Sequence, residues 1–125
     1  MNILIIDSDQ EVADYIEEVL LNTPGIDSPN TKRAAEAEEA NNLLYNASPD
    51  LVITEMDVPG SDGITIISAF RQYNAQTPVI VITKELDADT LSQLKLLNIH
   101  SVFAKPLIPE YIHQAITSAL NIQIN

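Results

Sequence analysis

Residues 49–63 of this 125-residue chain, PDLVITEMDVPGSDG, decide the fold. The short apolar run from Leu51 to Ile53 follows a Pro-Asp pair and ends in a polar loop that contains Pro and Gly. Such a run, bounded by turn signals, is typical of a central parallel strand, because helices cover both faces of that strand. Ligands of open α/β sheets bind just beyond the carboxyl ends of the strands. We therefore expect a functional site at residues 54–57, which are Thr, Glu, Met and Asp.

The rest of the chain repeats this alternation of strand and helix. Residues 26–32 are the least regular part, since Pro29 restricts them to an edge strand or an extended segment. Five strand-helix units predict a single α/β domain over residues 1–125, with a parallel sheet between two layers of helices. The other predicted strands are 2–6, 78–83 and 102–104. The first predicted helix ends near Asn22, and the other four span 34–46, 64–73, 86–97 and 109–120.

The first strand is followed by three polar residues, Asp7, Ser8 and Asp9. Ser8 and Glu11 have the spacing of a capping box, in which the two side chains satisfy free backbone donors at a helix start. Apolar residues at helical spacing follow between residues 12 and 20. We therefore expect the first helix to begin at Ser8.

The net charge of −12 lies entirely in the first half of the chain. Residues 1–62 contain fourteen acids against Lys32 and Arg33, whereas four acids balance four bases in residues 63–125. Such an acidic surface repels nucleic acid, so we expect no nucleic-acid binding by this domain. Cysteine is absent, which excludes thiolate chemistry. The chain has no basic leader and no run of about 18 apolar residues, so we expect a cytoplasmic protein that does not enter a membrane.

The order strand, Pro-Gly, one residue, Asp-Gly resembles the receiver domain of bacterial response regulators in two-component (phosphorelay) signalling. The acceptor aspartate of that family lies four residues before the proline, and counting back from Pro59 reaches Glu55. The resemblance extends from Ile3 to Leu120. It implies a flavodoxin-like, doubly wound (βα)5 three-layer sandwich with strand order 2-1-3-4-5.

The resemblance also implies a site at the strand ends. Asp7 corresponds to the acid after the first strand, Glu55 to the acceptor, Thr83 to the hydroxyl that contacts the phosphoryl group, and Lys105 to the lysine of a Lys-Pro pair. In the family, two acids after the first strand and the acceptor hold Mg²⁺ through oxygen ligands. Lys105-Pro106 becomes a candidate for a cis peptide bond.

Two departures concern the acceptor and the metal. Ser8 stands where a second carboxylate is expected, so we expect Mg²⁺ binding to be weak or lost, with no cofactor and only Asp7 left of the metal ligands. Glu55 carries its carboxylate about 1.5 Å farther than an aspartate does. From there we expect it to meet Lys105 and Thr83 directly, with Asp7 as the other possible partner of Lys105.

Two further departures concern access and switching. Lys84 replaces the small residue that leaves the pocket open in the family, and an ion pair between Lys84 and Asp57 would close the entrance as a gate. Val102 replaces the aromatic residue that the family often uses as part of its switch. The acidic pocket is therefore expected to consist of Asp7, Ser8, Glu55 and Asp57, with Thr83, Val102 and Lys105 as the switch positions.

These residues favour a degenerate receiver, or pseudo-receiver, that acts by protein-protein interaction without phosphorylation and without enzyme activity. Its partner would be a signalling protein bound at about residues 87–120, where side chains such as Tyr111 offer packing. One alternative is a receiver that a histidine kinase still phosphorylates, at Asp57 or Glu55. Another is a small phosphatase that resembles the haloacid dehalogenases, with Asp7 as nucleophile and Asp9 as acid/base. His100 and His113 lack metal-ligand spacing, so we expect them at the surface.

Overall fold

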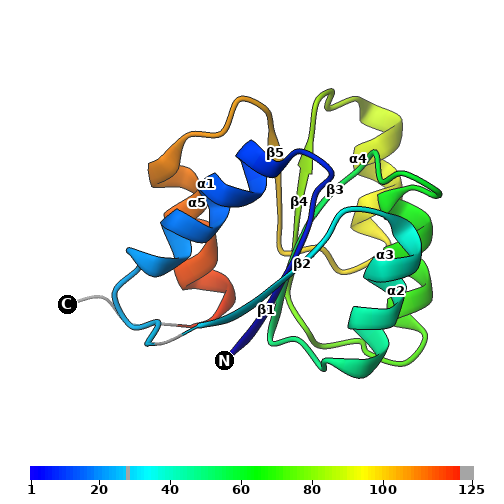
Figure 1. Cartoon of the computed structure of the whole chain (residues 1–125). Coiled ribbons are helices and arrows are strands. Elements are labelled where there is room, and N and C mark those ends of the chain that lie inside the picture. Colours follow the sequence, from blue (N-terminus) through cyan, green and yellow to red (C-terminus); the bar gives the residue numbers. More distant parts are fainter. Residues whose placement is uncertain (28, 122–125) are drawn as a thin grey trace.

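A computed structural model describes residues 1–27 and 29–121. Five parallel strands form one sheet in the order β2-β1-β3-β4-β5, which confirms the predicted topology (Figure 1). The parallel register pairs Ile5 with Ile53, and Ile53 with Ile80, so the three central strands lie level with one another. The strands are β1 (Asn2–Ile6), β2 (Asn30–Ala34), β3 (Leu51–Glu55), β4 (Val79–Thr83) and β5 (Ser101–Ala104).

The helices form a layer on each face of the sheet. α1 and α5 lie side by side on one face, and α2, α3 and α4 cover the other (Figure 1). None of the described helices is long and apolar enough to cross a membrane. The helices are α1 (Gln10–Leu21), α2 (Ala37–Asn46), α3 (Gly63–Arg71), α4 (Ala88–Lys95) and α5 (Pro109–Ala119).

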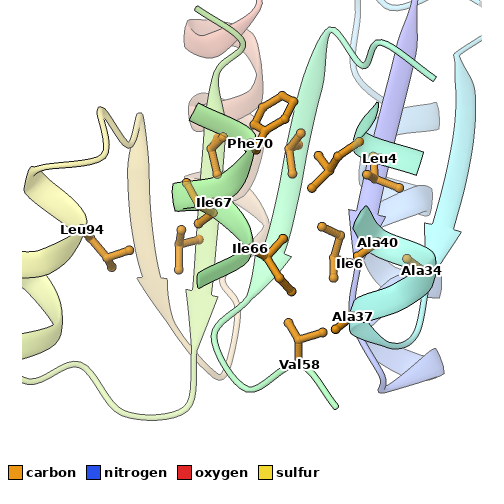
Figure 2. Close-up of a cluster of buried hydrophobic side chains, with 14 residues drawn as sticks. Leu4, Ile6, Ala34, Ala37, Ala40, Val58, Ile66, Ile67, Phe70 and Leu94 are labelled. Atoms are coloured by element: carbon orange, nitrogen blue, oxygen red, sulfur yellow. The ribbon is translucent and has the colours of Figure 1, made fainter. Parts of the chain in front are cut away.

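Each face of the sheet has its own hydrophobic core. Leu4 and Ile6 of β1 point to the α2-α3-α4 side, where they meet a cluster that includes Phe70 of α3 (Figure 2). Ile3 and Ile5 point to the α1-α5 side. Side chains on a strand alternate between faces, so burial on both faces explains why the central strands are continuous apolar runs.

The edge strand and the helix after it differ from their predicted positions. β2 spans Asn30–Ala34 instead of 26–32, and it is an edge strand as Pro29 requires. α2 begins at Ala37, three residues later than predicted. The cause is Ala34, which is fully buried as the last residue of β2 and pairs with Ile6. Alanine favours helices, but the ladder of the sheet overrides this weak preference.

The predicted capping box is wrong. Asp9 is the N-cap of α1, and its side chain accepts hydrogen bonds from the backbone N–H groups of Glu11 and Val12. Aspartate is as good an N-cap as serine. The N-cap therefore lies one residue later than predicted, and Ser8 remains in the loop after β1 with its backbone N–H directed to another partner.

Gly63 places the start of α3 directly against the end of β3. Its N–H donates to the Met56 carbonyl at 2.7 Å. A Cβ atom on residue 63 would lie 2.8 Å from the Glu55 carbonyl oxygen, closer than packing permits. The Asp-Gly pair of the sequence is thus used in two ways, because Asp62 caps α3 and Gly63 allows the close approach that holds Glu55 at the sheet edge.

Candidate functional site

The carboxyl ends of four strands deliver the predicted site residues to one edge of the sheet. Glu55 is the last residue of β3 and Thr83 the last of β4, while Asp7 and Lys105 directly follow β1 and β5. These four strands are adjacent in the sheet. The Lys105-Pro106 peptide bond is cis. The sequence therefore predicted correctly which segments meet at this edge.

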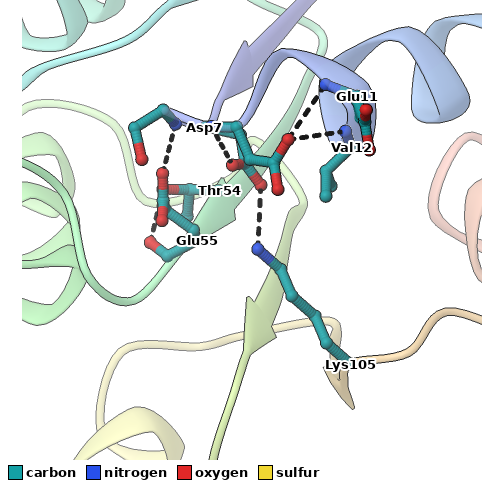
Figure 3. Close-up of polar contacts among 8 residues, drawn as sticks. Asp7, Glu11, Val12, Thr54, Glu55 and Lys105 are labelled. Atoms are coloured by element: carbon teal, nitrogen blue, oxygen red, sulfur yellow. Dashed lines mark hydrogen bonds and ion pairs between the residues drawn. The ribbon is translucent and has the colours of Figure 1, made fainter.

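Glu55 is buried at this edge, with only 5% of its surface exposed. Its Oε2 accepts a hydrogen bond from the backbone N–H of Ser8 (Figure 3). Burial raises the pKa of the Glu55 carboxyl most, and the nearby Asp7 carboxylate raises it further, whereas Ser8 and Lys105 lower it. The Glu55 side chain is thus held by the loop after β1, but burial makes its charged form energetically unfavourable.

Lys105 forms its ion pair with Asp7, at 3.5 Å between Nζ and Oδ2 (Figure 3). Asp7 Oδ1 also accepts the Asp9 backbone N–H at 2.9 Å, while the buried Oδ2 has no hydrogen-bond partner in the described structure. The expected direct contact between Glu55 and Lys105 is therefore wrong, and the Asp7 alternative is the one observed. The reason is that the longer Glu55 side chain reaches the Ser8 N–H instead.

Thr83 and the predicted gate also differ from expectation. The Thr83 hydroxyl donates to the Glu85 carbonyl at 2.7 Å, so it does not bond to Glu55. Lys84 and Asp57 are exposed and line the same cavity of about 390 Å³, but the ion pairs found among the described residues do not join them. The entrance is not closed by that pair.

Val102 lies in β5, where it pairs with Val81 and packs half-buried against the α2-α3-α4 core. Phe103, the aromatic neighbour, lies on the opposite side of the sheet, against the core under α1 and α5. Because neighbouring side chains of a strand point to opposite faces, Phe103 cannot take the place of an aromatic at position 102. The position that the receiver resemblance assigns to the switch aromatic therefore holds a small β-branched side chain.

The residues at this edge do not fit a Mg²⁺ site. Hard divalent cations need several oxygen ligands. Ser8 supplies no carboxylate, and Glu55 is bonded to a backbone N–H. In residues 1–27 and 29–121, no three Asp, Glu, His or Cys side chains come close enough together to hold a metal ion. The buried Asp7 Oδ2 is matched to Lys105 instead.

Sequence reasoning missed two functional atoms at this edge. The Ser8 backbone N–H is the direct partner of Glu55, although Ser8 was considered for its side chain only. The Asp9 carboxylate is occupied as a helix cap, so it is not free to serve as an acid or base. The sequence held one signal for the second point, since aspartate is a preferred N-cap residue and Asp9 lies three residues before Val12, the first apolar position of the helix.

This arrangement of strands, helices and strand-end residues is that of a receiver. A family model described as "Response regulator receiver domain" matches residues 3–117, and the chain belongs to this family. It is a receiver domain of the two-component response regulators, a class of signalling modules that interact with other signalling proteins.

Individual relatives agree with this assignment. Sporulation initiation phosphotransferase F of Bacillus subtilis is 30% identical over 98% of this chain and 96% of its own length. Response regulator protein PilR of Pseudomonas aeruginosa is 27% identical over 96% of this chain but only 26% of its own length.

Two solved structures show the same fold. The signal receiver domain of a DNA-binding response regulator from Colwellia psychrerythraea 34H has a TM-score of 0.86 and 28% identity, covering 97% of this chain and 98% of that one. A CheY-like receiver domain protein from Methanospirillum hungatei JF-1 has the same TM-score at 18% identity, covering 96% and 93% of the two chains.

Proposed function

We propose that this receiver domain signals through contacts with other proteins and does not accept a phosphoryl group at the family's acceptor position. The observation that carries this proposal is the buried Glu55 carboxylate held by the Ser8 N–H. An acceptor must be free to attack an incoming phosphoryl group, and this carboxylate is engaged with the neighbouring loop. In this proposal, the permanent contact between Glu55 and the Ser8 N–H takes the place of reversible phosphorylation.

The surrounding groups support the same conclusion. Lys105 is paired with Asp7, and the Thr83 hydroxyl donates to the Glu85 carbonyl. These are the two groups that the receiver resemblance assigns to the phosphoryl oxygens. Both have protein partners here, so a phosphoryl group would have to displace them. The poor fit to Mg²⁺ removes the charge shield that phosphoryl transfer needs.

The contact surface that we propose is residues 87–120, which contain α4, β5 and α5. Exposed apolar side chains are present there: Leu96 is 87% exposed, Tyr111 56% and Ile108 49%. Aromatic and large apolar side chains contribute most at protein-protein interfaces. For a protein that binds this domain, we expect Tyr111→Ala to weaken binding. Tyr45→Ala is the control, because Tyr45 is exposed on α2 outside this surface.

The test of the proposal is intact-mass measurement after incubation with acetyl phosphate and Mg²⁺. We expect no added mass on the wild-type chain. The double variant Ser8→Asp with Glu55→Asp restores the two carboxylates, so we expect it to bind Mg²⁺ and to gain one phosphoryl group. Adding Asp57→Asn to that double variant is the control, and it should leave the mass gain unchanged.

A mass gain on the wild-type chain that persists in Asp57→Asn would overturn the proposal. Such persistence would place the modification on Glu55, whereas loss of the gain in Asp57→Asn would place it on Asp57. A double variant that binds no Mg²⁺ would show that the two substitutions are not the reason for a closed site, and Lys84→Ala would be the next variant to measure.

A further inference from the structure

A second cavity lies between α1 and α5, away from the edge that holds Glu55. Its volume is about 540 Å³, within the range of small-molecule sites in proteins. One wall comes from α1 and its C-cap, with Tyr15, Glu18, Val19 and Asn22, and the other comes from α5, with Pro109, Glu110, His113 and Gln114. Figure 1 shows that the two helices lie side by side. Val19, Pro109 and the ring of Tyr15 make much of this lining apolar. The groove thus offers an apolar surface on which a ligand of moderate size can pack.

Acidic groups surround a buried hydroxyl in this groove. Tyr15 Oη is buried and has no hydrogen-bond partner among the described residues. Burial raises the pKa of the Tyr15 phenol, and the carboxylates of Glu110 and Glu18 raise it further. The negative charges of Glu18 on α1 and Glu110 on α5 therefore both affect the Tyr15 phenol, from opposite walls of the groove.

The hydrogen bonds of His113 define its tautomer. The Thr23 hydroxyl donates to the Val19 carbonyl at 2.6 Å, and a hydroxyl has only one hydrogen to donate. The 3.3 Å contact between Thr23 Oγ1 and His113 Nδ1 must then use a hydrogen on Nδ1. In the neutral ring, Nε2 carries a lone pair and is an acceptor. His113 is half-buried in the groove, which corrects the expectation of a surface residue.

The amide of Asn22 completes the pattern. Its Nδ2 donates to the Glu18 carbonyl at 2.9 Å, and its Oδ1 is an acceptor. The groove therefore presents two carboxylates, an imidazole lone pair and an amide oxygen. A ligand that matches these groups has hydrogen-bond donors and positive charge, and an anion such as a nucleotide is repelled.

We propose that the groove between α1 and α5 binds a small organic cation with an apolar body, of the arylalkylammonium class. The ammonium group would donate to Glu18 and Glu110, and the aryl part would pack on Val19, Pro109 and the ring of Tyr15. The ammonium group supplies three donors and no acceptor, which is complementary to the groove. This site is independent of the function proposed for Glu55.

Phenethylammonium is the probe, and chemical-shift mapping of backbone amides at pH 8 is the measurement. We expect saturable shifts confined to α1 and α5. The neutral analogue 2-phenylethanol tests the need for charge and should bind at least tenfold more weakly. Ethylammonium tests the need for an apolar body and should also bind at least tenfold more weakly.

Charge-matched variants locate the site. We expect Glu110→Gln and Glu18→Gln each to weaken phenethylammonium binding about fivefold or more, since each removes one charged acceptor. Glu38→Gln on the exposed face of α2 changes the net charge equally and should leave the affinity unchanged. Tyr15→Phe is a further control and should leave the affinity unchanged, because the Tyr15 hydroxyl is buried out of reach of a ligand.

Three results would overturn the inference. One is the absence of saturable shifts in α1 and α5. Another is equal binding of phenethylammonium and 2-phenylethanol, which would mean a purely apolar groove. The third is an equal loss of affinity in Glu38→Gln and Glu110→Gln, which would mean attraction to the acidic chain as a whole.

Discussion

Replacing Glu55 by glutamine tests the proposed role of this side chain directly. Glutamine has the same length, so its Oε1 still accepts the Ser8 N–H that now bonds to the carboxylate. The change removes the charge that burial and Asp7 disfavour. It also adds an amide donor beside Asp7, whose Oδ2 is buried without a hydrogen-bond partner among the described residues.

The energies of these changes have opposite signs. Hydrogen bonds to charged groups contribute about 1.5–3 kcal/mol and neutral ones about 0.5–1.5 kcal/mol, so the Ser8 bond loses about 1 kcal/mol. A donor for Asp7 Oδ2, which is paired with Lys105 at 3.5 Å but accepts no hydrogen bond from the described residues, regains about 1–3 kcal/mol. The raised pKa of Glu55 shows that its charged form is disfavoured in the folded state. We therefore expect Glu55→Gln to raise the free energy of unfolding at pH 8, by about 1 kcal/mol.

The pH dependence gives the sharper test. The pKa of Glu55 is higher in the folded chain than in the unfolded chain. As the pH falls through the folded-state pKa, the folded chain binds a proton before the unfolded chain does, so the wild type gains stability relative to the glutamine variant. The advantage of Glu55→Gln should thus shrink on acidification and vanish below the unfolded-state pKa of glutamate.

Urea denaturation from pH 8 to pH 4 measures this difference. Glu38→Gln is the control, since Glu38 is exposed on α2 and its variant should show no such trend. If Glu55→Gln were less stable than the wild type at pH 8, or its advantage did not change with pH, Glu55 would not be a buried carboxylate constrained as described.

The remaining predictions concern stability and are all measured by urea denaturation at neutral pH. Arg71 donates to three backbone carbonyls near the ends of α3 and α4, so Arg71→Met should cost about 2–3 kcal/mol; a loss below 0.5 kcal/mol would contradict this. Gly63→Ala should cost about 1–3 kcal/mol through overpacking against the Glu55 carbonyl, and an unchanged midpoint would refute it. Ser48, with φ of 46°, is exposed in a left-handed conformation, so Ser48→Gly should stabilise the chain by up to about 1 kcal/mol, whereas a loss would show that the serine side chain has a role.

The sequence predicted the topology because the strands are buried on both faces. Continuous apolar runs such as Val79–Thr83 are hard to mistake, and their alternation with helices permits few arrangements. Boundaries were less predictable where two preferences compete. Ala34 favours a helix by propensity but completes the β2 ladder, and this pairing with Ile6 is not visible in local sequence.

The sequence predicted which residues lie at the candidate site, but not which of them bond to one another. Strand order brings Asp7, Glu55, Thr83 and Lys105 to one edge, and this follows from sequence. Which of them bond depends on the reach of each side chain and on the backbone groups near it. Thr83 and Lys105 each have a partner closer than Glu55, namely the Glu85 carbonyl and Asp7. Sequence reasoning counted side-chain partners and omitted the backbone, which supplied two of these contacts.

The two substitutions at this site are physically coupled. Glu55 is long enough to reach the loop after β1, and it bonds there to the backbone of Ser8. An aspartate at position 8 would place a third carboxylate beside Asp7 and Glu55, with Lys105 as the cation already paired there. Like charges in a buried site disfavour ionisation. Serine at position 8 therefore permits the longer acid at position 55, and reversal of one substitution without the other leaves either unpaired charge or an unfilled N–H.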